Sequence, residues 1–145
     1  MKISKNKFLG MLVFLLISSI SISGQYKDAL ISRMSNFRNS VFANVDEGND
    51  FQQKEALRKM EKEWDKELNI VYQKIMKVAD PVTKNKLRNA QRAWIKFRDS
   101  EVEKSYYTNN PNGGSMGILF SLNTAAKLTE ERAVQLAEMY DALDK

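Results

Sequence analysis

Two pairs of acidic side chains have a spacing that could in principle supply an acid and a base for glycoside hydrolysis. Glu63 and Glu67 are four residues apart, and the same spacing recurs in Glu61 and Asp65. On a helix each pair would lie on one face, one turn apart, where two carboxylates could serve as acid and base in hydrolysis of a glycosidic bond. Lysines alternate with these residues, which is typical of a charged helix surface. We therefore interpret them as a solvated face.

The sequence contains no cysteine and no histidine. Disulfides, thiolate nucleophiles, imidazole bases and zinc sites built on these residues are therefore excluded. We predict a protein without catalytic residues, metal or cofactor. The length of 145 residues, with 43% hydrophobic and 28% charged residues, is that of one globular domain, and a domain of this size can bury a sufficient core without disulfides.

The first 24 residues have the pattern of a cleaved secretion signal. Lys2, Lys5 and Lys7 precede an apolar run at 8–20, and small residues follow up to Gly24. A membrane anchor is the alternative, but the run is shorter than the roughly 20 residues that span a bilayer. We expect cleavage after Gly24, an exported protein in the periplasm or outside the cell, and residues 25–145 as a single helical domain without stable membrane insertion.

The net charge of +5 does not indicate nucleic-acid binding. Three of the basic residues lie in the predicted signal, which leaves 20 basic and 18 acidic residues in the remainder. Binding to a phosphate backbone requires basic residues clustered on one face. We expect no nucleic-acid partner.

The remaining sequence predicts helices throughout. Apolar residues recur every three or four positions in three segments; they are Tyr26, Leu30, Met34, Phe37 and Val41, then Leu57, Met60, Trp64, Leu68, Val71, Tyr72, Ile75 and Val78, then Leu87, Ala90, Trp94, Phe97 and Val102. Asn49 or Asp50 can cap the second helix, and Asp80 followed by Pro81 ends it and begins the third. Because that connection is so short, we predict that the second and third helices pack face to face as an antiparallel hairpin.

After this hairpin, a cluster of asparagine and glycine at 109–115 cannot continue a helix and predicts an exposed loop. Residues 116–126 then predict a short helix, and Thr129 is the expected N-cap of a final short helix. The predicted fold is all-α, a small bundle built on a long antiparallel helical hairpin with a short C-terminal helix.

Four patterns resemble the LprI-type lysozyme inhibitor family. The most specific is LxxAQRAWIxFRD at 87–99, and the others are Glu67, Leu68, Asn69 and Tyr72; Gly113, Gly114 and Ser115; and Leu128, Thr129, Arg132, Ala133 and Leu136. The resemblance runs from about Ala56 to Leu143. It implies a small exported helical domain whose characterised relatives inhibit lysozyme. The family usually carries cysteines near Ala56, at Val102 and shortly before Thr129, so this chain would be a cysteine-free variant.

Several polar and aromatic residues have both a structural and a binding interpretation. Trp64 and Trp94 are expected in the core, with anchoring of a partner as the alternative. Asn69 and Gln91 are expected to hydrogen-bond each other across the hairpin, because a buried amide requires a partner. Leu68, Tyr72, Phe97, Asp99 and Thr129 are assigned structural roles.

Arginines and the loop are the candidate partner-binding residues. Arg98 can cover Trp94 with its stem and reach a carboxylate or carbonyl, but not its neighbour Asp99, which points about 100° away on a helix. Arg132 has the same two interpretations, structural or ligand-binding. In the loop, glycines free backbone amides for hydrogen bonds to a partner. The predicted contact residues are Asn109, Asn110, Gly113, Gly114, Ser115, Arg98 and Arg132.

Two functional hypotheses follow. The first is a protein that binds lysozyme or another peptidoglycan hydrolase and occludes its cleft. The second is an envelope interaction or assembly module with the same fold but no lysozyme inhibition. Neither pattern nor composition indicates the oligomeric state.

Overall fold

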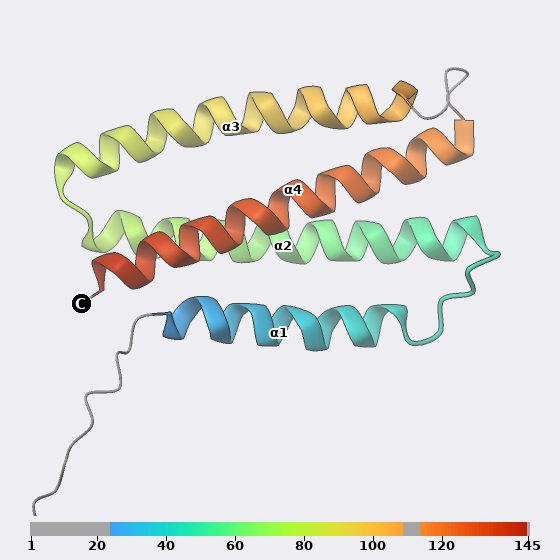
Figure 1. The fold of residues 1–145 in the computed structure, drawn as a ribbon, viewed down its shortest axis with the longest axis horizontal. Coiled ribbons are helices and arrows are strands. Elements are labelled where there is room, and N and C mark those ends of the chain that lie inside the picture. The colour runs from blue at the N-terminus through green and yellow to red at the C-terminus, as the bar shows by residue number, and fades with distance from the viewer. Residues whose placement is uncertain (1–23, 109–113, 145) are drawn as a thin grey trace, which may run out of the picture.

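The computed structural model describes residues 24–108 and 114–144, and in this part of the chain four helices are present (Figure 1). They are α1 (Gln25–Phe42), α2 (Asp50–Val78), α3 (Pro81–Thr108) and α4 (Gly114–Leu143). The all-α class is confirmed. Residues 1–23 of the predicted signal at 1–24 and the loop residues Asn109, Asn110 and Gly113 lie outside the described residues.

Side-chain caps begin two of the helices where the sequence predicts them. The side chain of Asn49 accepts a hydrogen bond from the backbone N–H of Gln52 at the start of α2. At the start of α3, Asp80 accepts from the N–H groups of Val82 and Thr83. These bonds satisfy N–H groups that have no partner within the helix.

The first turn of α1 is capped from the far end of the chain. Gly24 precedes the helix and offers no side chain, and the carboxylate of Asp141 on α4 accepts instead from the N–H groups of Tyr26 and Lys27, both at 2.9 Å. A carboxylate here also opposes the positive end of the helix dipole. This contact fixes α1 against the end of α4.

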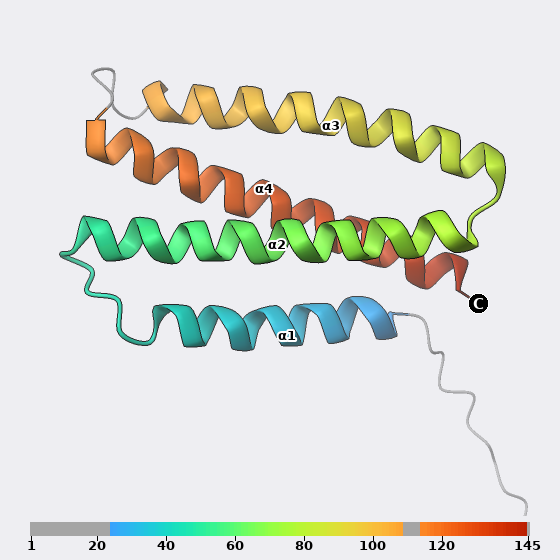
Figure 2. The ribbon, with the colours of Figure 1, turned by 180° about the vertical axis from the view of Figure 1, so that it is seen from behind.

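The α4 helix is the centre of the bundle. It runs diagonally from beside the end of α3 across α2 towards the start of α1 (Figures 1 and 2), and it packs against all three. Its core-facing stripe consists mainly of small side chains, which permit close approach of neighbouring helices; they are Ala126, Thr129, Ala133 and Ala137. Opposite them lie Leu30 and Met34 of α1 and the α2 stripe of Met60, Trp64, Leu68, Val71 and Ile75.

The predicted face-to-face packing of α2 and α3 is therefore wrong. The two helices do run in opposite directions, but α2 packs chiefly against α4, and α3 reaches the core through α4. The third helix contributes only Leu87 to the buried apolar core, while Ala90 is exposed and Phe97 is 53% exposed rather than inward.

The predicted break before Thr129 and the short C-terminal helix are also wrong, because α4 continues for 30 residues. Thr129 is fully buried, and its hydroxyl donates to the carbonyl of Ala125 at 2.8 Å, one turn back in the same helix. A threonine followed by glutamates has the same local pattern at a cap and inside a helix, and here its hydroxyl is satisfied within the helix.

Candidate functional site

The end of the bundle where α3 meets α4 contains Gly114 and Ser115, for which the predicted loop is wrong, because they are the first two residues of α4. Gly114 has φ = 81°, in the left-handed region that glycine tolerates, and its N–H donates to the hydroxyl of Tyr106 at 3.0 Å. This bond holds the first residue of α4 against the last turns of α3. The chain thus enters α4 in a fixed direction.

Ser115 is bound to the first turn of α2. Its hydroxyl donates to the carboxylate of Asp50 at 2.6 Å and accepts from the ammonium of Lys54. The ammonium also lies 3.7 Å from Asp50. Because its hydroxyl is already engaged, Ser115 positions this end of the bundle.

Three large apolar side chains are exposed at the same end. Phe51 is 71% exposed, Tyr107 is 56% exposed and Met116 is 44% exposed. They belong to the first turn of α2, the last turn of α3 and the first turn of α4, which meet at one end of the molecule (Figure 1). We call these three residues, with Gly114 and Ser115, the end surface. Because exposed apolar surface at one end of a molecule can bind a partner, this end is a candidate interaction site.

A second feature is an open cleft of about 420 Å³ between α2 and α3. Its α2 wall consists of Asp65, Leu68, Asn69 and Tyr72, and its α3 wall consists of Arg88, Gln91, Arg92, Trp94, Ile95 and Arg98. Five of these α3 residues belong to the 87–99 pattern that carries the family resemblance.

Arg98 lies over Trp94 as predicted, with the guanidinium carbon 5.2 Å from the centre of the indole ring. The prediction that it cannot pair with Asp99 is wrong. Its Nε and Nη2 donate to one oxygen of Asp99 at 3.0 and 2.8 Å. The long arginine side chain folds back over the indole and so reaches a carboxylate that starts on a different face of the helix.

Arg132 and Gln91 form a partly buried polar contact. The Nε of Arg132 donates to the side-chain oxygen of Gln91 at 3.0 Å, and its Nη1 donates to Gln135 at 3.2 Å. Burial lowers the pKa of the Arg132 guanidinium from its ordinary value. No carboxylate of the described residues pairs with it. The predicted Asn69–Gln91 bond is wrong, because Asn69 is exposed and donates to Asp65 within α2.

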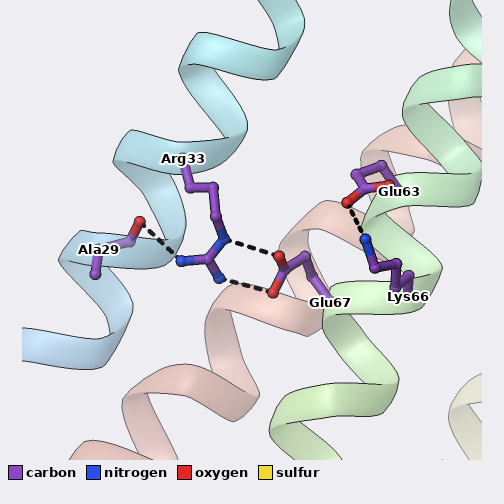
Figure 3. A network of polar contacts seen from close by, with 5 residues as sticks. All are labelled: Ala29, Arg33, Glu63, Lys66 and Glu67. Carbon is purple, nitrogen blue, oxygen red and sulfur yellow. Dashed lines mark hydrogen bonds and ion pairs between the residues drawn. The ribbon is translucent and has the colours of Figure 1, made fainter.

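Glu63 and Glu67, which the sequence offered as a possible acid and base, each bind a basic side chain (Figure 3). Glu67 is 4% exposed, and its two oxygens accept from Nε and Nη2 of Arg33 on α1 at 2.9 and 2.8 Å. Glu63 accepts from Lys66 at 2.7 Å. The solvated-face interpretation is therefore wrong for Glu67. The hydrogen bond to Glu67 raises the pKa of Arg33 above its ordinary value.

Sequence reasoning missed this ion pair, although a signal was present. Glu67 lies three residues after Trp64 and four before Val71, so it falls on the buried stripe of α2 and not beside it. No comparable signal marked Arg33, whose side chain is half exposed on α1.

Two kinds of site are absent from residues 24–108 and 114–144. No group of three or more acidic side chains is close enough together to hold a metal ion. None of the helices described there combines the length and apolarity that crossing a membrane requires.

A family model described as lysozyme inhibitor LprI matches residues 43–136 of the chain. The matched segment begins directly after α1 and includes all of α2, all of α3 and α4 as far as Leu136. Both the end surface and the cleft lie within it. No curated protein and no solved structure matches the chain.

Proposed function

The chain belongs to the LprI lysozyme inhibitor family, and from this we propose that it binds lysozyme or a related peptidoglycan hydrolase and blocks the enzyme's cleft. The observation that carries the proposal is the family match, which covers all of α2 and α3 and most of α4. That family is described by inhibition and not by a reaction, in line with a binding protein rather than an enzyme.

We assign the contact to the end surface together with the adjoining segment 109–113. Interfaces derive most of their binding energy from a few large, well-packed side chains, and aromatic residues are prominent among them. Tyr107 and Met116 are such groups, and the bonds of Gly114 and Ser115 to α3 and α2 hold the backbone beside them in place. A fixed backbone reduces the entropy lost on binding.

The physical mechanism is competition for the space that the glycan must occupy. A glycosidase places its substrate between two carboxylates, so a protein segment lodged there prevents hydrolysis without any chemistry of its own. Backbone N–H groups of a connecting segment can donate to those carboxylates. The arginines predicted as contacts contribute less here, because Arg98 and Arg132 are already bonded within α3 and to Gln91, respectively.

The test is a titration of the chain from Gly24 onward, which contains every described helix, into a cell-wall lysis assay with an animal lysozyme. We expect inhibition by the unaltered chain. The variant Y107S/M116S should raise the half-inhibitory concentration about tenfold or more, given about 1 kcal/mol or more per anchoring side chain. A matched control, V78S/V82S, removes two exposed apolar side chains at the opposite end, 48% and 63% exposed, and should shift it less than about twofold.

The outcomes separate the two parts of the proposal. Absence of slowing at large molar excess contradicts inhibition of that lysozyme. Inhibition that both double variants retain equally contradicts the assignment to the end surface. Circular dichroism of each variant shows whether the helices are intact.

Export is part of the same proposal. The pattern at 1–24 supports it, and so does the start of α1 at Gln25, directly after the proposed cleavage position. Mass spectrometry of the secreted or periplasmic protein should find an N-terminus at Gln25. A chain that retains residues 1–24 would contradict cleavage.

A second candidate function is an envelope interaction or assembly module without lysozyme inhibition. The observation that favours it is the absence of the cysteines usual in the family, since the chain has none. A pull-down from envelope extract that recovers a partner with the unaltered chain and not with Y107S/M116S, together with a negative lysis assay, would favour this function.

A further inference from the structure

Helix α3 carries a run of positive charge that acidic residues do not balance. Between Asp80 and Asp99 there is no acidic residue, and six basic residues are present, namely Lys84, Lys86, Arg88, Arg92, Lys96 and Arg98. Of these six, only Arg98 forms an ion pair with a described residue. Arg88 and Arg92 lie on the wall of the cleft between α2 and α3 and remain available to a ligand.

The cleft also contains a neutral hydrogen-bond donor, the side-chain amide of Gln91. An arginine can only donate hydrogen bonds, so the bond from Arg132 fixes the side-chain oxygen of Gln91 towards α4. Gln91 is among the residues that line the cleft, and its amide NH₂ is then left to donate elsewhere. The partly buried guanidinium of Arg132, which donates to the side-chain oxygen of Gln91, adds positive potential beside the cleft. Together these groups favour a carboxylate.

The apolar part of the cleft favours a peptide over a sugar. Its accessible apolar surface comes mainly from Tyr72 and Ile95, which suit an aliphatic side chain, while Leu68 of the lining is buried. One face of the Trp94 indole is covered by Arg98 at 5.2 Å, so that face is not available for stacking against a sugar ring. From Arg88 to Arg98 the wall extends about 15 Å at 1.5 Å per helical residue. That length matches about four residues of extended chain.

We propose that the cleft between α2 and α3 binds a short acidic peptide segment of a partner protein, with its carboxylates on Arg88 and Arg92 and an aliphatic side chain against Tyr72 and Ile95. Arginine clusters recognise acidic motifs by bidentate hydrogen bonds, which gives this arrangement both charge and geometric selectivity. The site is separate from the end surface and does not depend on lysozyme inhibition.

The test follows the two tryptophan indole N–H signals by NMR while a ligand is added. Trp94 lines the cleft, whereas the indole N–H of Trp64 is buried in the core without a hydrogen-bond partner, so Trp64 serves as an internal control. The probe is a blocked tetrapeptide of alternating glutamate and leucine. The comparison ligands are the same peptide with glutamine in place of glutamate, and a tetramer of galacturonic acid.

We expect the acidic peptide to shift the Trp94 signal with a dissociation constant below about 1 mM, and to leave Trp64 unchanged. The variant R88Q/R92Q should weaken binding about tenfold or more, because it removes both charged donors. The control K86Q/K96Q makes the same change of net charge on the same helix at residues that do not line the cleft, and it should weaken binding less than about threefold.

Four results would overturn the proposal. They are no saturable shift of Trp94, equal binding of the glutamine peptide, equal weakening in the two double variants, and binding of the galacturonic acid tetramer in place of the peptide. The third would indicate a general attraction to a basic helix, and the fourth a carbohydrate site.

Discussion

Replacing Arg33 by methionine should destabilise the fold far more than its exposure suggests. The change removes both charged donors from Glu67, whose side chain is only 5% exposed, and so leaves a buried carboxylate without its partner. Breaking a buried pair in this way typically costs about 3 to 5 kcal/mol. Because the Arg33 side chain is 50% exposed and water can reach part of the site, we expect a smaller loss, about 2 to 3 kcal/mol.

The same helix provides a matched control. Arg38 is 54% exposed and pairs with Glu130 at 3.4 Å, but the side chain of Glu130 is 37% exposed. An ion pair between exposed groups contributes about 0 to 1 kcal/mol. R38M should therefore cost less than about 1 kcal/mol, although the two arginines are equally exposed. The difference between the variants isolates the burial of the carboxylate.

Urea unfolding followed by circular dichroism measures both variants. With a slope of about 1 to 3 kcal/mol per molar urea, R33M should lower the midpoint by roughly 1 M or more, and R38M by much less. The double variant R33M/E67M should recover much of the loss, since it removes the buried charge as well as its partner. Equal midpoints for R33M and R38M would refute the reasoning.

Two further predictions concern close packing and high pH. G117A should destabilise the fold by about 1 to 3 kcal/mol, because the added methyl would lie 2.7 Å from the carbonyl oxygen of Tyr106. The control G48A should be close to neutral in the same urea assay, since its added methyl would lie 3.4 Å from its nearest neighbour, a carboxylate oxygen of Asp46. Burial raises the pKa of Tyr26 above its ordinary value, with Glu67 as the next contributor, so the folded state holds this proton more tightly than the unfolded state. The resulting stability is present below pH about 10 and is lost as pH rises further. Between pH 9 and 11 the melting temperature of Y26F should therefore fall less steeply than that of the unaltered chain. Equal slopes for the two proteins would contradict the assignment to Tyr26.

Local sequence signals predicted the helices and most of their buried faces. Apolar spacing located Leu30, Met60 and Ile75 in the core, and the caps at Asn49 and Asp80 are present because short polar side chains satisfy free N–H groups within one turn. Such signals depend only on neighbours in sequence, and they are therefore independent of how the helices pack.

The arrangement of the helices could not be predicted in this way. A short connection between α2 and α3 permits face-to-face packing but does not require it, and α4, through its stripe of alanines and Thr129, packs more closely on α2 than α3 does. Because α2 and α3 do not pack face to face, Ala90 and Phe97 are exposed and a cleft is present beside Trp94. The site residues were identified by type, but their partners depend on tertiary contacts such as that between Arg132 and Gln91.

The most direct test of the central claim is hydrolysis of a soluble chromogenic oligosaccharide by lysozyme in the presence of the chain from Gly24 onward. A basic protein can slow lysis of cell walls by coating them, but it cannot protect a small soluble substrate in this way. If the chain occupies the enzyme's cleft, hydrolysis of the soluble substrate should stop at near-equimolar inhibitor. Inhibition that appears only with intact walls would contradict cleft occlusion.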